Sequence, residues 1–152
     1  MKQSALHVNQ LNRKIGTFQM ADKVSRPNIG WIKTIRKGLG MSSEQLAKKL
    51  QITRQSVLSI EQREKNGSIT LKNLELAAQA MDMKLVYGVV PKDGSLDKLI
   101  ERKALQLATE IVLRASDTMY LEGQGNSPER IKKAIKERAK ELKEEMPKKL
   151  WD

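Results

Sequence analysis

The segment from Ser43 to Gln62, SEQLAKKLQITRQSVLSIEQ, constrains the fold more than any other part of the chain. Its spacing predicts two short helices joined by a tight turn. Ala47 is small enough to lie where two helix backbones cross, and Val57 and Ile60 lie ten and thirteen residues later, on the inner face of the second helix. Leu46 and Leu50 fill the small core under the turn. The segment therefore predicts a helix-turn-helix.

The outward face of the second helix carries polar side chains near its start, which we place at Thr53. Arginine reads guanine through two hydrogen bonds, glutamine reads adenine, and serine is adaptable. Base-reading residues belong near the N-terminus of the helix that enters the major groove, and helix N-termini with their caps can hold phosphates. We therefore expect double-stranded DNA as a partner. The residues expected to contact it are Ser43, Thr53, Arg54, Gln55, Ser56, Ser59 and Gln62.

The composition agrees with a polyanionic partner and argues against catalysis. Lys and Arg number 29 against 18 Asp and Glu, a net charge of +11, and residues 1–40 alone carry +7. There is no Cys and the only His is His7, so thiolate chemistry and two-His metal sites are excluded. No apolar run approaches the roughly 18–20 residues that span a bilayer. We expect no catalytic residue, cofactor or metal, no membrane contact, and a cytoplasmic location.

The rest of the chain predicts a mainly α, repressor-like helix-turn-helix bundle with one short strand and two added C-terminal helices. Helices are expected over 3–20 and 30–39, from Thr70, from Ser95 to about 122–125, and from Ser127 to about 146. Three regions follow. They are an N-terminal basic helix or arm (1–28), a helix-turn-helix DNA-binding domain (29–91) and a C-terminal helical region (92–152).

Two segments leave alternatives open. The only strand candidate, residues 84–90 (KLVYGVV), can pair with its own copy in a dimer, or lie as a buried extended segment within one chain. The basic N-terminal segment can be an arm that tracks DNA phosphates. Alternatively, it is a helix packed on the domain through Leu11, Ile15 and Phe18.

An ion pair between Arg36 and Glu61 is expected to be structural.

Residues 30–90 resemble the helix-turn-helix family of the phage repressors and Cro proteins, through IKTIRKGLGMSSEQLAKKLQITRQSVLSIEQREKNGSITLKNLELAAQAM. Two positions depart from that pattern. The family often has Gly in the turn, where this chain has Gln51, and a non-Gly residue in a left-handed turn costs about 1 kcal/mol. The family also often has Gln where this chain has Ser43, so a phosphate contact there would be shorter and weaker.

A closer resemblance covers nearly the whole chain. The motifs PNIGWIKTIRKGLGM, SITLKNLELAAQAM, LVYGVVP, DTMYLEGQ and the terminal LWD resemble the "mobile mystery protein A" family, whose members are encoded beside a Fic-domain partner. The resemblance implies a two-part system of a DNA-binding regulator with antitoxin-like character and a Fic protein that transfers AMP. The Fic motif HPFxxGNGR is absent here, so the enzyme would be the other polypeptide.

A second motif bears on that partner. Fic inhibitors of the antitoxin type carry [ST]xxxE[GN] on a helix, where the Glu pairs with an active-site Arg and blocks the ATP γ-phosphate. This chain contains one match, with Thr118, Glu122 and Gly123 at the expected positions. The alternative is an ordinary helix C-terminus with a Gly cap and a solvent-facing Glu.

These patterns together predict a bacterial, sequence-specific transcriptional regulator that binds its own promoter as a homodimer and joins the nucleoid when bound. A second hypothesis is an antitoxin that inhibits a Fic AMP-transferase by direct contact.

Overall fold

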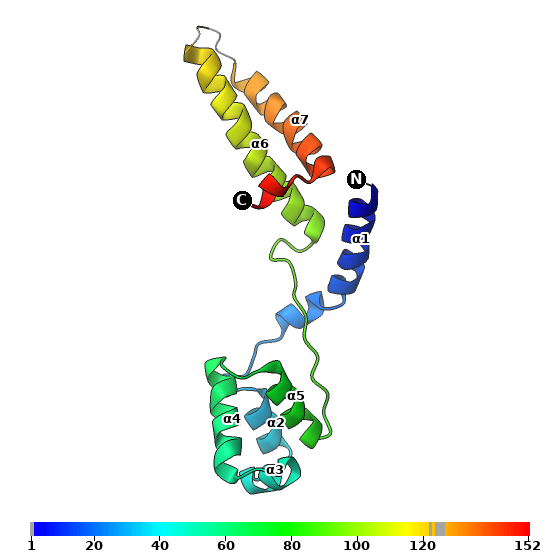
Figure 1. Cartoon of the computed structure of the whole chain (residues 1–152), viewed down its shortest axis with the longest axis vertical. Coiled ribbons are helices and arrows are strands. Elements are labelled where there is room, and N and C mark those ends of the chain that lie inside the picture. The colour runs from blue at the N-terminus through cyan, green and yellow to red at the C-terminus, as the bar shows by residue number, and fades with distance from the viewer. Residues whose placement is uncertain (1, 122, 124–126) are drawn as a thin grey trace. The chain divides into compact units, whose positions relative to one another are not determined.

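The computed structural model describes residues 2–121, 123 and 127–152, and throughout these residues the chain forms helices and connecting segments without a strand. The α-helices are α1 (Lys2–Gly16), α2 (Trp31–Gly38), α3 (Ser43–Leu50), α4 (Arg54–Asn66), α5 (Leu71–Ala80), α6 (Leu96–Leu121) and α7 (Pro128–Glu145). Two short 3-10 helices, η1 (Gln19–Lys23) and η2 (Lys148–Trp151), complete the set (Figure 1). The mainly α class is confirmed.

The helices belong to two compact units. One unit contains residues 23–88, with α2 to α5, and the other combines residues 1–22 with residues 89–152. Each unit has its own hydrophobic core.

The unit of residues 23–88 is built around the helix-turn-helix. Its buried core residues come from all four helices and the turn after α5; they are Ile32, Leu46, Ala47, Val57, Ala77 and Met81. Leu50 and Ile60 pack against this cluster from the edge. The small residue expected at the helix crossing and the aliphatic residues expected on the inner face are therefore inside, as their spacing predicts.

Side-chain caps fix where the helices begin. Thr53 accepts a hydrogen bond from Ser56 N at 3.1 Å, and Thr70 accepts one from Asn73 N at 3.2 Å. Ser127 does the same for α7. A cap satisfies one of the backbone N–H groups that a helix leaves without a partner, and is worth about 1 kcal/mol. The predicted helix starts are confirmed.

The short strand predicted for residues 84–90 is not formed in the single chain. Val86, Tyr87 and Val89 are 67, 68 and 83% exposed, so the alternative of a buried extended segment is wrong. β-Branched residues favour an extended backbone, but a strand also needs a neighbouring strand with which to exchange hydrogen bonds. No described residue supplies one. Pairing with a second copy involves two chains and stays a prediction.

The other unit is organised around the α6·α7 hairpin. Its core consists of Ile100, Ala104, Leu107, Ala108, Leu142 and Leu150, with Val8 of α1 packed against it. The Asn12 side chain of α1 accepts a hydrogen bond from Leu96 N at 2.9 Å and donates one to Asp97 at 2.8 Å. These contacts favour the packed-helix alternative for the N-terminal segment, but α1 packs on α6 and makes its contacts through Val8 and Asn12. Leu11, one of the three residues expected to make the contact, is exposed.

An ion pair joins the turn before α6 to that helix. Arg102 donates to Asp93 through Nε at 2.8 Å and Nη2 at 3.0 Å, and this hydrogen bonding lowers the pKa of the Asp93 carboxyl.

Among the described helices, none combines the length and the apolar character required to cross a membrane.

Candidate nucleic-acid interface

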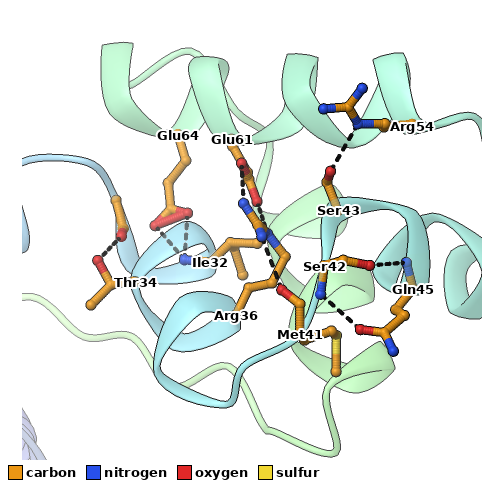
Figure 2. A network of polar contacts seen from close by, with 11 residues as sticks. Ile32, Thr34, Arg36, Met41, Ser42, Ser43, Gln45, Arg54, Glu61 and Glu64 are labelled. Carbon is orange, nitrogen blue, oxygen red and sulfur yellow. Dashed lines mark hydrogen bonds and ion pairs between the residues drawn. The ribbon is translucent and has the colours of Figure 1, made fainter.

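A buried ion pair fixes α4 against α2. Arg36 donates through Nε to Glu61 Oε1 at 2.6 Å and through Nη2 to Glu61 Oε2 at 3.2 Å, and both side chains are buried. The remaining guanidinium nitrogen, Nη1, donates to the carbonyl oxygen of Met41 at 3.0 Å, in the connection between α2 and α3 (Figure 2). The pair predicted from the sequence is therefore present. Because the guanidinium makes two parallel hydrogen bonds to the carboxylate, the pair fixes the orientation of the two side chains as well as the distance between them.

A second buried carboxylate of α4 caps the start of α2. The N-cap position of α2 is Gly30, which has no side chain to accept a hydrogen bond. Glu64 takes that role, because its carboxylate accepts from Trp31 N and from Ile32 N. Figure 2 shows the second of these contacts, whose distance is 3.1 Å. A negative charge at a helix N-terminus is favoured by the helix dipole. Gly30 has φ +89°, and an added Cβ would lie 2.9 Å from Cδ of Glu64.

The turn between α3 and α4 has the geometry that its sequence implies. Gln51 adopts a left-handed conformation at φ 58° and ψ 40°, where the resembling family often has Gly. Ile52 N donates to Ala47 O at 3.0 Å, which closes the end of α3. A left-handed C-cap without glycine is tolerated here because the cost is only about 1 kcal/mol.

The start of α3 is closed by a capping box. Ser42 Oγ accepts from Gln45 N at 3.1 Å, and Gln45 Oε1 accepts from Ser42 N at 2.8 Å (Figure 2). Gln45 was not predicted to belong to this surface, although Ser-x-x-Gln is a recognised signature of this motif. Glu64 was also missed, since nothing in the local pattern of α4 separates it from a solvated glutamate.

The predicted DNA-contacting residues gather around the N-terminus of α4. Thr53, Arg54, Gln55, Ser59 and Gln62 are exposed, and Ser43 and Ser56 are half-buried. Arg54 Nε donates to Ser43 Oγ at 3.1 Å, so the structure brings the starts of α3 and α4 together (Figure 2).

Gln62 lies two turns further along α4 and donates to Asn66 at 3.3 Å. It is therefore not part of the group at the N-terminus. Whether these side chains touch DNA stays a prediction.

The charge of this unit is strongly positive. Residues 23–88 contain twelve Lys and Arg and five Asp and Glu, for a net charge of +7. Two of the five acids, Glu61 and Glu64, and one of the twelve bases, Arg36, are buried. The residues that are not buried therefore carry a net charge of +8, from eleven bases and three acids. A basic surface beside a helix-turn-helix favours phosphate contacts.

Neither a metal site nor the complete inhibitory motif is seen among the described residues. Over residues 2–121, 123 and 127–152, no group of three or more His, Cys, Asp or Glu is arranged to hold a metal ion. Thr118 of the inhibitory motif is exposed on α6 and donates to Arg114 O at 3.1 Å, and Gly123 has φ +78°. Glu122, the central residue of that motif, lies outside the described residues.

Comparison with known proteins supports the geometry. The family model that matches is described as helix-turn-helix, and it covers residues 32–87, from the start of α2 to the segment after α5. No curated protein and no solved structure matches the chain. Residues 32–87 therefore form a helix-turn-helix domain of the phage-repressor type, the domain of DNA-binding transcription regulators.

Proposed function

We propose that the chain is a sequence-specific regulator of transcription that reads double-stranded DNA with the N-terminal half of α4. The observation that carries the proposal is the contrast between the two faces of this helix. Val57 is completely buried, whereas Arg54, Gln55 and Ser59 are exposed. A helix that is anchored from behind and carries these side chains in front can lie in the major groove.

Each exposed side chain has a distinct expected role. Arg54 is suited to guanine and Gln55 to adenine, because each can make two hydrogen bonds to its base. In the free protein Arg54 is held by Ser43, so this contact limits the positions that its guanidinium samples before it meets a base. Thr53 and Ser43, at the starts of α4 and α3, are suited to phosphate contacts.

The test is to select binding sites from a random DNA library and to measure affinities for the selected and scrambled sequences. Arg54→Ala and Gln55→Ala should each cost about 1–3 kcal/mol on the selected site and relax preference at one position. Arg63→Ala is the matched control, because Arg63 is an exposed arginine in the last turn of the same helix. Equal affinity of the unaltered chain for selected and scrambled DNA would refute the proposal.

The finer proposal is autorepression as a homodimer, with half-sites about one helical turn, or 34 Å, apart. We propose that the repressed promoter belongs to a bacterial two-gene module with a Fic-domain protein, and that the regulator works in the cytoplasm on the nucleoid. Support comes from the resemblance carried by motifs spread over the chain. A neighbouring reading frame with HPFxxGNGR, and loss of reporter repression on deletion of this chain, are the expected results.

The second candidate function is inhibition of that Fic AMP-transferase through residues 118–123. It is favoured by Thr118, which lies exposed in the last turn of α6, and by the left-handed Gly123 that follows the helix. Glu122→Gly should release AMP transfer by the cognate Fic protein while DNA binding is unchanged. Full inhibition by the Glu122→Gly variant would reject this function.

A further inference from the structure

Residues 84–90, which follow the helix-turn-helix, combine exposed apolar side chains with a backbone that makes no backbone hydrogen bonds in the described part of the chain. Val86, Tyr87 and Val89 expose most of their surface, and the backbone of residues 84–90 makes no backbone hydrogen bond with the described part of the chain. Unpaired backbone groups are a template for strand pairing with another chain when they adopt an extended conformation. The segment is rich in β-branched and aromatic residues, which fit such a ladder.

We propose that residues 84–90 of two copies pair as antiparallel strands about a two-fold axis at Tyr87. This inference identifies the dimer contact of the proposed regulator. The proposed function gives the dimer its biological role, but the pairing itself can be measured without DNA. A two-fold axis is the commonest symmetry of homodimers, and it makes each contact occur twice.

The sequence is complementary to itself in this register. Tyr87 comes opposite Tyr87 of the second copy, and Leu85 comes opposite Val89. These three positions share one face of the ribbon because side chains alternate along a strand. Aromatic and β-branched cross-strand pairs are among the stabilising ones, so that face of the ribbon is apolar throughout.

The backbone requirements fit the same register. If the two Tyr87 residues form a non-hydrogen-bonded pair, every second residue along the strand also lies in a non-hydrogen-bonded pair. Pro91, four residues away, is one of these residues. Antiparallel pairs alternate between hydrogen-bonded and non-hydrogen-bonded types, so the missing N–H of proline costs nothing there. The residues that exchange hydrogen bonds are Val86 with Gly88 and Lys84 with Val90.

The charges at the two ends also favour a second copy as the occupant. With the axis at Tyr87, Lys84 comes level with Val90, and Lys92 comes level with Asp82 of the other chain. Moving the axis by one residue, to Gly88, would instead place Lys84 opposite Lys92. Like charges directly opposite one another destabilise a ladder. The pattern therefore favours the register centred on Tyr87 over the one centred on Gly88, and it makes the segment complementary to a second copy of itself.

Cysteine cross-linking tests the register, since the chain has no Cys of its own. In a non-hydrogen-bonded pair the two Cα atoms lie about 4.5 Å apart, within the range that a disulfide spans. Full-length Tyr87→Cys under mild oxidation should therefore form a disulfide-linked dimer of twice 17.2 kDa. The unaltered chain should sediment as a dimer without DNA.

Val89→Cys is the matched control. Residue 89 is more exposed than residue 87, so random collisions would cross-link Val89→Cys faster. The proposed register predicts the reverse order, with cross-linking of Tyr87→Cys at least tenfold faster. The double variant Leu85→Cys, Val89→Cys should also cross-link. Within one extended strand these two positions are about 13 Å apart, so its disulfides join two chains.

Three results would overturn the inference. They are a monomeric unaltered chain at tens of micromolar, cross-linking of Val89→Cys as fast as Tyr87→Cys, and cross-linking of the 85/89 double variant no faster than that of its single variants. A dimer with the expected cross-links that shows no preference for any DNA sequence would reject the proposed function and leave the pairing intact. Sequence-specific binding with the wrong cross-links would reject the pairing alone.

Discussion

Removing the Glu64 carboxylate should destabilise the helix-turn-helix unit by an amount that the structure allows us to estimate. In Glu64→Ala the N–H of Ile32, which is buried, loses its acceptor, and leaving a buried donor unpaired costs about 1–3 kcal/mol. Loss of a negative charge at the N-terminus of α2 adds about 0.3–1 kcal/mol. We therefore expect the free energy of unfolding to fall by about 1–4 kcal/mol.

The conservative variant separates the two contributions. Glu64→Gln retains one acceptor oxygen but loses the charge, so its cost should be about 1 kcal/mol. Glu75→Ala is the matched control, because Glu75 is an exposed glutamate on α5 and surface changes usually stay within about 0.5 kcal/mol.

Urea titration followed by tryptophan fluorescence is the assay. The chain has two tryptophans, Trp31 at the start of α2 and Trp151 in the other unit. All variants are therefore made in a Trp151→Phe background, so that the signal reports on α2. If Glu64→Ala costs no more than Glu75→Ala, the carboxylate does not stabilise α2 and the reasoning is wrong. If Glu64→Gln costs as much as Glu64→Ala, charge is the whole effect and the orphaned donor contributes nothing.

Three further predictions use the same titration. Gly30→Ala should lower the free energy of unfolding by at least about 2 kcal/mol, because residue 30 has a positive φ and its new Cβ would meet Glu64. This cost should be smaller in the Glu64→Ala background. If the costs of the two substitutions are simply additive, the contact between residues 30 and 64 is contradicted. Arg36→Ala should lower the free energy of unfolding by about 3–5 kcal/mol, because it leaves Glu61 buried and unpaired. The double variant Arg36→Met, Glu61→Leu should stay within about 1 kcal/mol of the parent. An equal loss of stability in both variants would contradict the role of the unpaired charge. Ser42→Ala should cost about 1 kcal/mol, and no loss would mean that the capping box does not hold α3.

The helix-turn-helix could be predicted from the sequence because its determinants are local. Thr53 caps α4 within one turn, and Val57 and Ile60 lie three residues apart, a spacing that places both on the inner face of α4. The left-handed position of Gln51 follows from the same local pattern. Exposure of Arg54 and Gln55 follows once the inner face of the helix is assigned.

The contacts that could not be predicted join residues far apart in the sequence. Glu64 has the same local surroundings as a solvated glutamate, and its partners lie more than thirty residues earlier. Asn12 caps the start of α6 from a helix that begins the chain. For residues 84–90 the composition favours a strand, but pairing requires a neighbour that this single chain does not provide.

The buried acids also connect the stability of α4 with the charge that DNA meets. Glu61 is neutralised by Arg36 inside the unit, so replacing both with apolar residues removes no net charge. Their loss should leave the salt dependence of DNA binding unchanged, because the number of phosphates neutralised at the surface is the same. Removing an exposed lysine such as Lys48 leaves the core intact. If that lysine contacts a phosphate, its removal makes the affinity for DNA depend less steeply on salt concentration. A change in slope for the Arg36→Met, Glu61→Leu variant would mean that the ion pair positions phosphate-binding residues as well as α4.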